Sequence, residues 1–438
     1  MYVLSKYNVY IDYSDDKTFV FNTATGSGAL LDNKLVGQDC SFDDASEVEK
    51  TMLLKHGFFC PVDSEKGYDV FREAARVKYY ADDFKSQLFI ITPTMSCNAD
   101  CRYCFEKDQH KFSEMSEDMQ SKTLAFMRHR IESHPKTKKV TVSFFGGEPT
   151  LKLSIVEHLS SEIRRICQDK GIEYDARIIT NGILLNNENT KRLVDAGVIR
   201  CQVTLDGLED AWTKSKNLPA SLFYRILSNL RVAVDNGMKP IVRINIDKNN
   251  KCDIIKLLDI LFGGLDLAGK IQVTPCLLKV WNDTDDTEHY MSSEEYLDFL
   301  DECREYVLSK GWERSFDNYP LGPKPSSCGM MRQSAIGIRY DGKLYQCEHM
   351  FSEEMVDGVL VPIGDVTNGL YENSPMRDVF GQETEPMEGH DCKTCKWYPV
   401  CHGGCRMEYI MHHRLFDCES FEAESIARLK YMLRTMGR

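Results

Sequence analysis

The stretch that decides the fold is Thr92 to Glu106, TPTMSCNADCRYCFE. It places three cysteines, Cys97, Cys101 and Cys104, in the spacing C-x3-C-x2-C. The apolar run 88–91 directly before it contains two isoleucines and predicts a buried strand, and the polar residues between the first two cysteines predict a loop. Three thiols are therefore expected on one loop at the carboxyl end of a strand, where open α/β folds bind ligands.

Three neighbouring cysteines suit an iron–sulfur cluster better than a zinc ion. A cubane cluster takes soft thiolates on its irons, so three cysteines leave one iron open for a small molecule. A structural zinc site takes four ligands, usually from paired C-x2-C segments. The spacing resembles the signature of the radical S-adenosylmethionine (SAM) family, in which the amino and carboxylate groups of SAM chelate the open iron. By this resemblance, Tyr103 lies against the adenine.

The composition limits the partners of the chain. The 438 residues carry a formal net charge of −13, with a pI of about 5.4, which argues against nucleic acid as the main partner. No long apolar run and no signal peptide are evident, so we expect no membrane span and no secretion. Without secretion, the seventeen cysteines favour cluster ligation over disulfides, in a reducing cytoplasm.

From residue 88 onward, short β-branched runs alternate with segments of helical periodicity. This alternation predicts a parallel α/β sheet, and its six strands agree with the six-stranded partial barrel of the radical SAM family. The strands are expected at 88–91, 140–145, 176–180, 201–205, 241–246 and 270–274, and the helices between them at 119–131, 155–166, 188–196, 222–236 and 252–261.

A glycine-rich motif closes the second predicted strand. Gly146 and Gly147 let the backbone approach a ligand closely, and the carboxylate of Glu148 can face an ammonium group. A simple strand-to-helix turn is the alternative. In the radical SAM family this GGEP segment holds the amino group of SAM.

Further candidates for SAM contacts lie at the ends of the next strands. They are Asn181, Thr204, Arg243 and Asn245, of which the last two alternate on one strand and share a face. Facing inward, Arg243 and Asn245 would reach the carboxylate and ribose of SAM by resemblance, whereas facing outward they would be surface residues. Many relatives carry His and Arg after the Asp-Gly of the fourth strand. Residues 206–216 contain neither, so a lysine there is a candidate for the carboxylate partner.

The N-terminal residues predict a small separate module. Residues 9–13 and 19–21 predict a hairpin and 46–56 a helix. Such units resemble the winged-helix leader-binding module of peptide-modifying enzymes, and a plain N-terminal cap is the alternative.

The C-terminal cysteines form a second system. They follow the order C-x13-G-x4-C and then C-x2-C-x5-C-x3-C with one further cysteine, which resembles the SPASM extension of radical SAM enzymes. The glycine, Gly342, is expected in a hairpin turn. By resemblance, Cys328, Cys347 and Cys405 hold a nearer auxiliary cluster, and Cys392, Cys395, Cys401 and Cys418 hold an outer one. Residues 321–327 lack the fourth cysteine of relatives, so either an iron is open or a distant residue such as Cys303 closes the site.

The sequence thus predicts an α/β protein of three parts. Residues 1–83 are expected to form a small α+β (winged-helix-like) leader-recognition module, 84–310 the partial barrel, and 311–438 the SPASM domain. The remaining cysteines are expected for the most part to be buried thiols. They are Cys40, Cys60, Cys167, Cys201, Cys252 and Cys276.

The resemblance implies a radical SAM peptide maturase. Reductive cleavage of SAM would give a 5′-deoxyadenosyl radical that takes hydrogen from a precursor-peptide side chain and forms a carbon–carbon cross-link of the Lys–Trp type. Thioether formation from cysteine and anaerobic sulfatase maturation to formylglycine are alternatives, and a non-catalytic iron–sulfur electron carrier is the rival from another class. The implied cofactors are SAM and three [4Fe-4S] clusters. The implied partners are a precursor peptide with leader and core, and an electron donor such as flavodoxin or ferredoxin.

Overall fold

The computed structural model describes residues 2–36, 41–62, 83–106, 112–279, 288–317, 321–324, 326–351, 353–381, 391–413 and 415–435. By its internal contacts the chain forms two compact units. The larger comprises Phe84–Asn318 and Gln333–Arg377, and the smaller comprises Met1–Asp83, Tyr319–Arg332 and Asp378–Arg438. The division into three domains made from the sequence stays a prediction.

The larger unit is built on a sheet whose central strands are parallel and follow one another in chain order. This arrangement confirms the predicted α/β class. All the carboxyl ends of these strands lie at the same edge, which gathers the loops that follow them. The strands are β6 (Ser86–Ile91), β7 (Lys139–Phe144), β8 (Glu173–Thr180), β9 (Val198–Thr204), β10 (Lys239–Ile246) and β11 (Gln272–Leu277).

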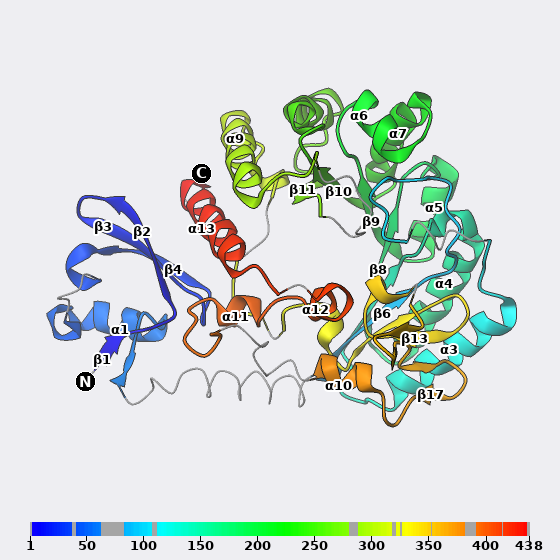
Figure 1. Cartoon of the computed structure of the whole chain (residues 1–438), viewed down its shortest axis with the longest axis horizontal. Helices are drawn as coiled ribbons and strands as arrows, with labels where there is room; N and C mark the ends of the chain where they lie inside the picture. Colours follow the sequence, from blue (N-terminus) through cyan, green and yellow to red (C-terminus); the bar gives the residue numbers. More distant parts are fainter. Residues whose placement is uncertain are drawn as a thin grey trace. The chain divides into compact units, whose positions relative to one another are not determined.

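Helices connect these strands, and α3, α4, α5 and α7 lie along one side of the sheet (Figure 1). Helix α4 buries Val156, Leu159 and Ile163 on its apolar face. Among the described residues, no helix combines the length and the apolar composition needed to cross a bilayer. The helices are α3 (Glu117–Glu132), α4 (Leu153–Asp169), α5 (Asn187–Asp195), α6 (Glu209–Lys216), α7 (Ala220–Asp235), α8 (Ile254–Leu258), which continues as a π-helix Asp259–Gly264, and α9 (Ser293–Lys310).

A seventh parallel strand, not predicted from the sequence, pairs with β6 on its other edge. This is β12 (Ala335–Ile338), and all four of its residues are buried. The predicted hairpin turn at Gly342 is confirmed, because it joins β12 to β13 (Lys343–Tyr345), which runs antiparallel to it. The sheet ends with β16 (Gly364–Asp365) and β17 (Gly369–Leu370), while β14 (Met355–Val356) and β15 (Val359–Leu360) form a separate pair.

The smaller unit contains elements from both ends of the chain. Its three-stranded antiparallel sheet orders β2, β3 and β4, and a short pair joins β1 to β5. The elements are β1 (Tyr2–Leu4), β2 (Asn8–Ser14), β3 (Lys17–Asn22), β4 (Ser27–Asp32), α1 (Glu47–Lys55), β5 (Phe59–Pro61), α11 (Tyr398–Cys401), α12 (Arg406–His412) and α13 (Cys418–Thr435); α10 (Pro375–Gly381) crosses from one unit to the other. The predicted hairpin and helix of the N-terminal module are present as β2–β3 and α1.

The three-stranded sheet is buried on both faces. Val20 on β3 belongs to a core with Leu53 of α1. Its neighbours Phe19 and Phe21 point to the other face, because side chains alternate along a strand. There they pack in a second core with C-terminal residues, Trp397, Val400 and Leu429. The N-terminal sheet and the C-terminal tail therefore share one hydrophobic core.

This shared core predicts the effect of one substitution. Phe21 is 1% exposed, so Phe21→Ala should destabilise the smaller unit by about 3–5 kcal/mol, since it removes a buried ring and leaves a cavity. The matched control is Tyr13→Ala on β2, whose side chain is 55% exposed and which should cost less than about 0.5 kcal/mol. Urea unfolding followed by intrinsic fluorescence measures both. Equal effects of the two changes would contradict the shared core.

Candidate functional site

The three cysteines of C-x3-C-x2-C lie on the loop between β6 and α3, which we call the cluster loop (92–106). Cys97, Cys101 and Cys104 are each partly buried and close enough to interact electrostatically. Burial raises the pKa of Cys97 and of Cys104 to about 12. Metal loading must therefore displace protons from these thiols. A set of three soft, partly shielded thiols on one loop fits an iron–sulfur cluster.

The glycine motif after β7 holds one side of the cluster loop. Gly147 donates its backbone N–H to the carbonyl of Thr94 (3.2 Å), and Glu148 donates to that of Ser96 (2.8 Å). A Cβ atom on Gly146 would lie 2.4 Å from the Thr94 carbonyl oxygen, and one on Gly147 would lie 2.3 Å from that of Met95. The glycines thus allow a close backbone approach to the cluster loop.

Glu148 is buried and fully engaged. Its carboxylate accepts hydrogen bonds from Thr150, from the Thr180 hydroxyl (2.7 Å) and from the Asn181 N–H (2.7 Å). Burial raises its pKa, and these hydrogen bonds oppose the shift. Asn181 in turn donates to Asn98 on the cluster loop (2.7 Å). Glu148 therefore links the ends of β7 and β8, and its charge acts on Cys97.

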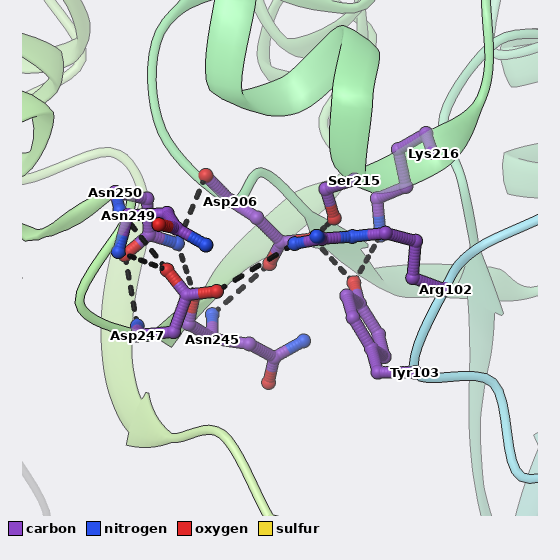
Figure 2. Close-up of polar contacts among 9 residues, drawn as sticks. All are labelled: Arg102, Tyr103, Asp206, Ser215, Lys216, Asn245, Asp247, Asn249 and Asn250. Carbon is purple, nitrogen blue, oxygen red and sulfur yellow. Dashed lines mark hydrogen bonds and ion pairs between the residues drawn. The ribbon is translucent and has the colours of Figure 1, made fainter. Parts of the chain in front are cut away.

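The other side of the cluster loop is held by the end of α6 (Figure 2). Lys216 lies with its Nζ 2.9 Å from the Asp206 carboxylate, and Tyr103 donates its hydroxyl to the same carboxylate. The side chains are buried, at 4% exposure for Lys216 and 1% for Asp206. Two backbone hydrogen bonds also join these segments: the Asp100 N–H donates to the Lys216 carbonyl, and the Arg102 N–H donates to the Ser215 carbonyl.

The charges in this group support one another. Burial by itself would lower the pKa of Lys216, but the Asp206 carboxylate, Tyr103 and Cys101 raise it well above its ordinary value. Burial and Asp206 raise the pKa of the Tyr103 hydroxyl, which stays protonated. The site therefore holds a fixed cation, a fixed anion and a neutral phenol in contact.

A second acidic side chain extends the network toward β10 (Figure 2). Asp247 accepts from the N–H groups of Asn249 (2.9 Å) and Asn250 (3.0 Å), and its carboxylate lies 3.7 Å from the Arg102 guanidinium. Asn245 N–H donates to Asp206 at 3.1 Å. The loops after β9 and β10 thus contact two adjacent residues of the cluster loop: Asp206 bonds Tyr103, and Asp247 pairs with Arg102.

The remaining predicted SAM contacts lie on one pair of strands. Arg243 of β10 is in register with Thr204 of β9, and its Nε donates to the Asn245 side chain (2.8 Å). Their role toward SAM stays a prediction. Of the two lysines in 206–216, Lys214 is exposed and Lys216 is paired with Asp206. A lysine as the partner of the SAM carboxylate stays a prediction.

Two acidic residues near the cysteines were not predicted. Glu106, at the end of the cluster loop, is 3% exposed, and burial together with the nearby Glu348 carboxylate raises its pKa to about 8. Burial raises the pKa of Glu348 as well. Phe105 stacks on His349, with 4.2 Å between ring centroids. In the sequence, Glu106 follows Cys104 by two residues and Glu348 directly follows Cys347. This closeness to proposed cluster ligands is the signal that could have identified both glutamates.

The tail cysteines fall in different units. Cys392, Cys395, Cys401 and Cys418, proposed for the outer cluster, all lie in the smaller unit and interact electrostatically. Three consecutive residues with positive φ, His402, Gly403 and Gly404, turn the chain between Cys401 and Cys405. Cys328 and Cys405 belong to the smaller unit and Cys347 to the larger, so the nearer cluster stays a prediction.

The other cysteines are mostly buried, as expected. Cys167, Cys201 and Cys303 are buried and Cys60 and Cys276 are partly buried, but Cys252 is exposed, which contradicts burial at that position. Cys40 lies outside the described residues. In the described part of the chain, no three Cys, His, Asp or Glu side chains converge as the ligands of a single metal ion would.

Comparison with known families identifies the larger unit. Residues 91–261 match the Radical SAM superfamily. These residues form a radical SAM domain. The match spans the cluster loop, the glycine motif and the acidic side chains of the loops after β9 and β10, which confirms the family predicted from the cysteine spacing.

Three proteins are similar to this chain beyond the matched residues. A cysteine-type anaerobic sulfatase-maturating enzyme of Clostridium novyi (strain NT) is 24% identical over 387 residues, which cover 81% of this chain and 99% of the relative. The structure of native anSMEcpe with bound AdoMet and Cp18Cys peptide has a TM-score of 0.61 at 18% identity, covering 80% of this chain and 98% of that one. Streptococcus suis SuiB bound to precursor peptide SuiA has a TM-score of 0.54 at 14% identity, covering 92% and 95%.

The close approach at the glycine motif predicts a substitution effect. In Gly147→Ala the added methyl would meet the backbone carbonyls of Met95 and Ser96 at 2.3 and 2.4 Å, so the cluster loop must shift. Iron bound after anaerobic reconstitution should fall by the content of one cluster. Gly264→Ala is the control, since its nearest contact would be an ordinary 3.8 Å. Full iron content in Gly147→Ala would show that the loop does not need this fit.

Proposed function

We propose that this radical SAM enzyme modifies a peptide and, more specifically, forms a carbon–carbon cross-link between lysine and tryptophan side chains of a precursor peptide. The observation that carries the radical chemistry is the cluster loop, which presents three thiols at the carboxyl edge of a parallel sheet and is held from both sides. When bound there, a cluster and SAM supply a radical that takes a hydrogen atom from an unactivated carbon.

Two relatives support a peptide substrate. The anSMEcpe structure holds a Cp18Cys peptide and the SuiB structure holds the precursor peptide SuiA. The SuiB similarity covers 92% of this chain, against 80% for anSMEcpe, which favours a precursor peptide whose leader binds the N-terminal module.

Sulfatase maturation is the second candidate, because the Clostridium novyi relative is covered over 99% of its length. Thioether formation is the third candidate. Residues 321–327 contain no fourth cysteine, so an open iron of the nearer cluster could bind the sulfur of a substrate cysteine.

The proposed cofactor set follows the cysteines. Cys97, Cys101 and Cys104 would hold the cluster that binds SAM, with Glu148, Asn181, Thr204, Arg243 and Asn245 as proposed neighbours of SAM. Two auxiliary clusters in the tail would accept the electron that leaves the substrate when a cross-link forms. An external flavodoxin or ferredoxin would supply the first electron, and a reducing cytoplasm would protect the clusters.

The residues of this chain also have to accept a proton. Joining two side chains with loss of two hydrogens removes one as an atom and one as a proton. Burial raises the pKa of Glu106 to about 8 and also raises the pKa of its neighbour Glu348, which the Arg177 guanidinium opposes at Glu348 alone. We propose Glu348 as the general base, because the positive charge of Arg177 favours its ionised form.

The first test is SAM cleavage. Anaerobic enzyme given SAM and dithionite should form 5′-deoxyadenosine, and Cys101→Ala should form none, because the cluster loses a thiolate anchor. A non-catalytic electron carrier would form no 5′-deoxyadenosine, with or without the substitution. Cleavage of SAM by Cys101→Ala would contradict the assignment of Cys101 as a cluster ligand.

The second test separates the substrates by mass spectrometry. A peptide encoded beside this chain and containing Lys and Trp should lose two hydrogens, with the cross-link in the fragmentation pattern. An aldehyde that reacts with a hydrazide on a sulfatase peptide would favour formylglycine instead. A cysteine-linked fragment would favour the thioether.

Substitution of the proposed base should separate radical formation from product formation. Glu348→Gln keeps the shape but cannot take the proton, so 5′-deoxyadenosine should still form while modified peptide falls about 10²–10⁴-fold. Glu372→Gln, at an exposed position, is the control and should retain full activity. Normal product formation by Glu348→Gln would remove it from the mechanism.

A further inference from the structure

Lys216 places a buried positive charge beside the proposed SAM cluster. It is the last residue of α6 and is 4% exposed. Its ammonium lies 2.9 Å from Asp206, bonds the Tyr103 hydroxyl and sits 4.8 Å from the centroid of the Tyr103 ring. The same ammonium interacts electrostatically with Cys101.

The placement of the loop does not rest on this charge alone. The backbone carbonyls of Ser215 and Lys216 accept the N–H groups of Arg102 and Asp100 whatever side chain is present at 216. A methionine there would keep the length of the apolar stem and lose the charge. The buried ammonium therefore calls for an explanation beyond loop placement, since a buried ion pair is weak evidence for stability.

We propose that Lys216 is a positioning residue that raises the reduction potential of the iron–sulfur cluster held by Cys97, Cys101 and Cys104, and that Asp206 opposes it. This inference rests on the proposed function, in which that cluster takes up an electron to cleave SAM.

The two side chains act on the reduction potential of the cluster through their charges. The potentials of iron–sulfur clusters follow the net charge, the hydrogen bonds to sulfur and the solvent exposure around them. Reduction adds one negative charge to the cluster, and a cation next to Cys101 stabilises that charge. Asp206, which also acts on Cys101, has the reverse effect, so the two side chains set the potential between them.

The charge that each substitution removes sets the direction in which the reduction potential changes. Lys216→Met leaves the Asp206 carboxylate uncompensated, so the potential should become more negative. Asp206→Asn keeps an oxygen to accept the Asn245 N–H and leaves the ammonium alone, so the potential should become more positive. We expect each change to alter the equilibrium constant for reduction at least tenfold, which is about 59 mV for one electron. The double variant should return toward the wild type.

The experiment is a redox titration of the reconstituted full-length enzyme, followed by electron paramagnetic resonance. The SAM cluster is recognised as the signal that changes on adding SAM and is missing in Cys101→Ala. Lys216→Arg, which retains the charge, should keep a potential near that of the wild type.

Each outcome decides between the alternatives. Opposite shifts in Lys216→Met and Asp206→Asn support the proposal. No shift, or shifts of the same sign, would show that the pair is structural and would overturn it. If Lys216→Met fails to hold the cluster, Asp206→Asn must still shift the potential upward, and its failure to do so overturns the proposal. A wild-type enzyme with no SAM-sensitive signal would instead contradict the proposed function.

Discussion

The buried ion pair between Lys216 and Asp206 is the interaction on which the site depends. Both side chains are almost completely withdrawn from water, and removing one member of such a pair typically costs about 3–5 kcal/mol because the other charge is left unpaired. Through Tyr103 and the adjoining backbone, the pair fixes the cluster loop on one side, while the glycine motif fixes it on the other. The cysteines are thus placed by neighbouring strand ends, and the loop needs little secondary structure of its own.

A second constraint joins the two ends of the chain. Phe19 and Phe21 on β3 share a core with Trp397 and Leu429, which come between 376 and 410 residues later in the chain. The Thr23 hydroxyl also bonds the Lys396 carbonyl, next to Cys395. Contacts of such long sequence separation carry the entropy cost of closing a long loop. The N-terminal sheet therefore supports the segment that carries Cys392, Cys395 and Cys401, in addition to any part it has in binding a leader.

The sequence was informative where periodicity or spacing was strong. The six parallel strands, the helices with apolar faces and the family all followed from runs such as 140–145 and from the cysteine triad. Strand β12 was missed because four residues carry too little pattern, and α6 was missed because its EDAWTKSK text lacks an apolar stripe. The partnership of Tyr103, Asp206 and Lys216 was out of reach, since it depends on which loops the parallel sheet brings to one edge. Glu106 and Glu348 acquire their shifted pKa values from burial, which no local pattern reveals.

The central claim is that the cluster loop holds a cluster with one iron left open for SAM. Electron–nuclear double resonance on the reduced enzyme, mixed with SAM labelled with nitrogen-15 at its amino group, tests it most directly. The account predicts a hyperfine coupling between that nitrogen and the cluster, present in the wild type and lost in Cys101→Ala. A reduced, SAM-saturated enzyme with no such coupling would contradict it.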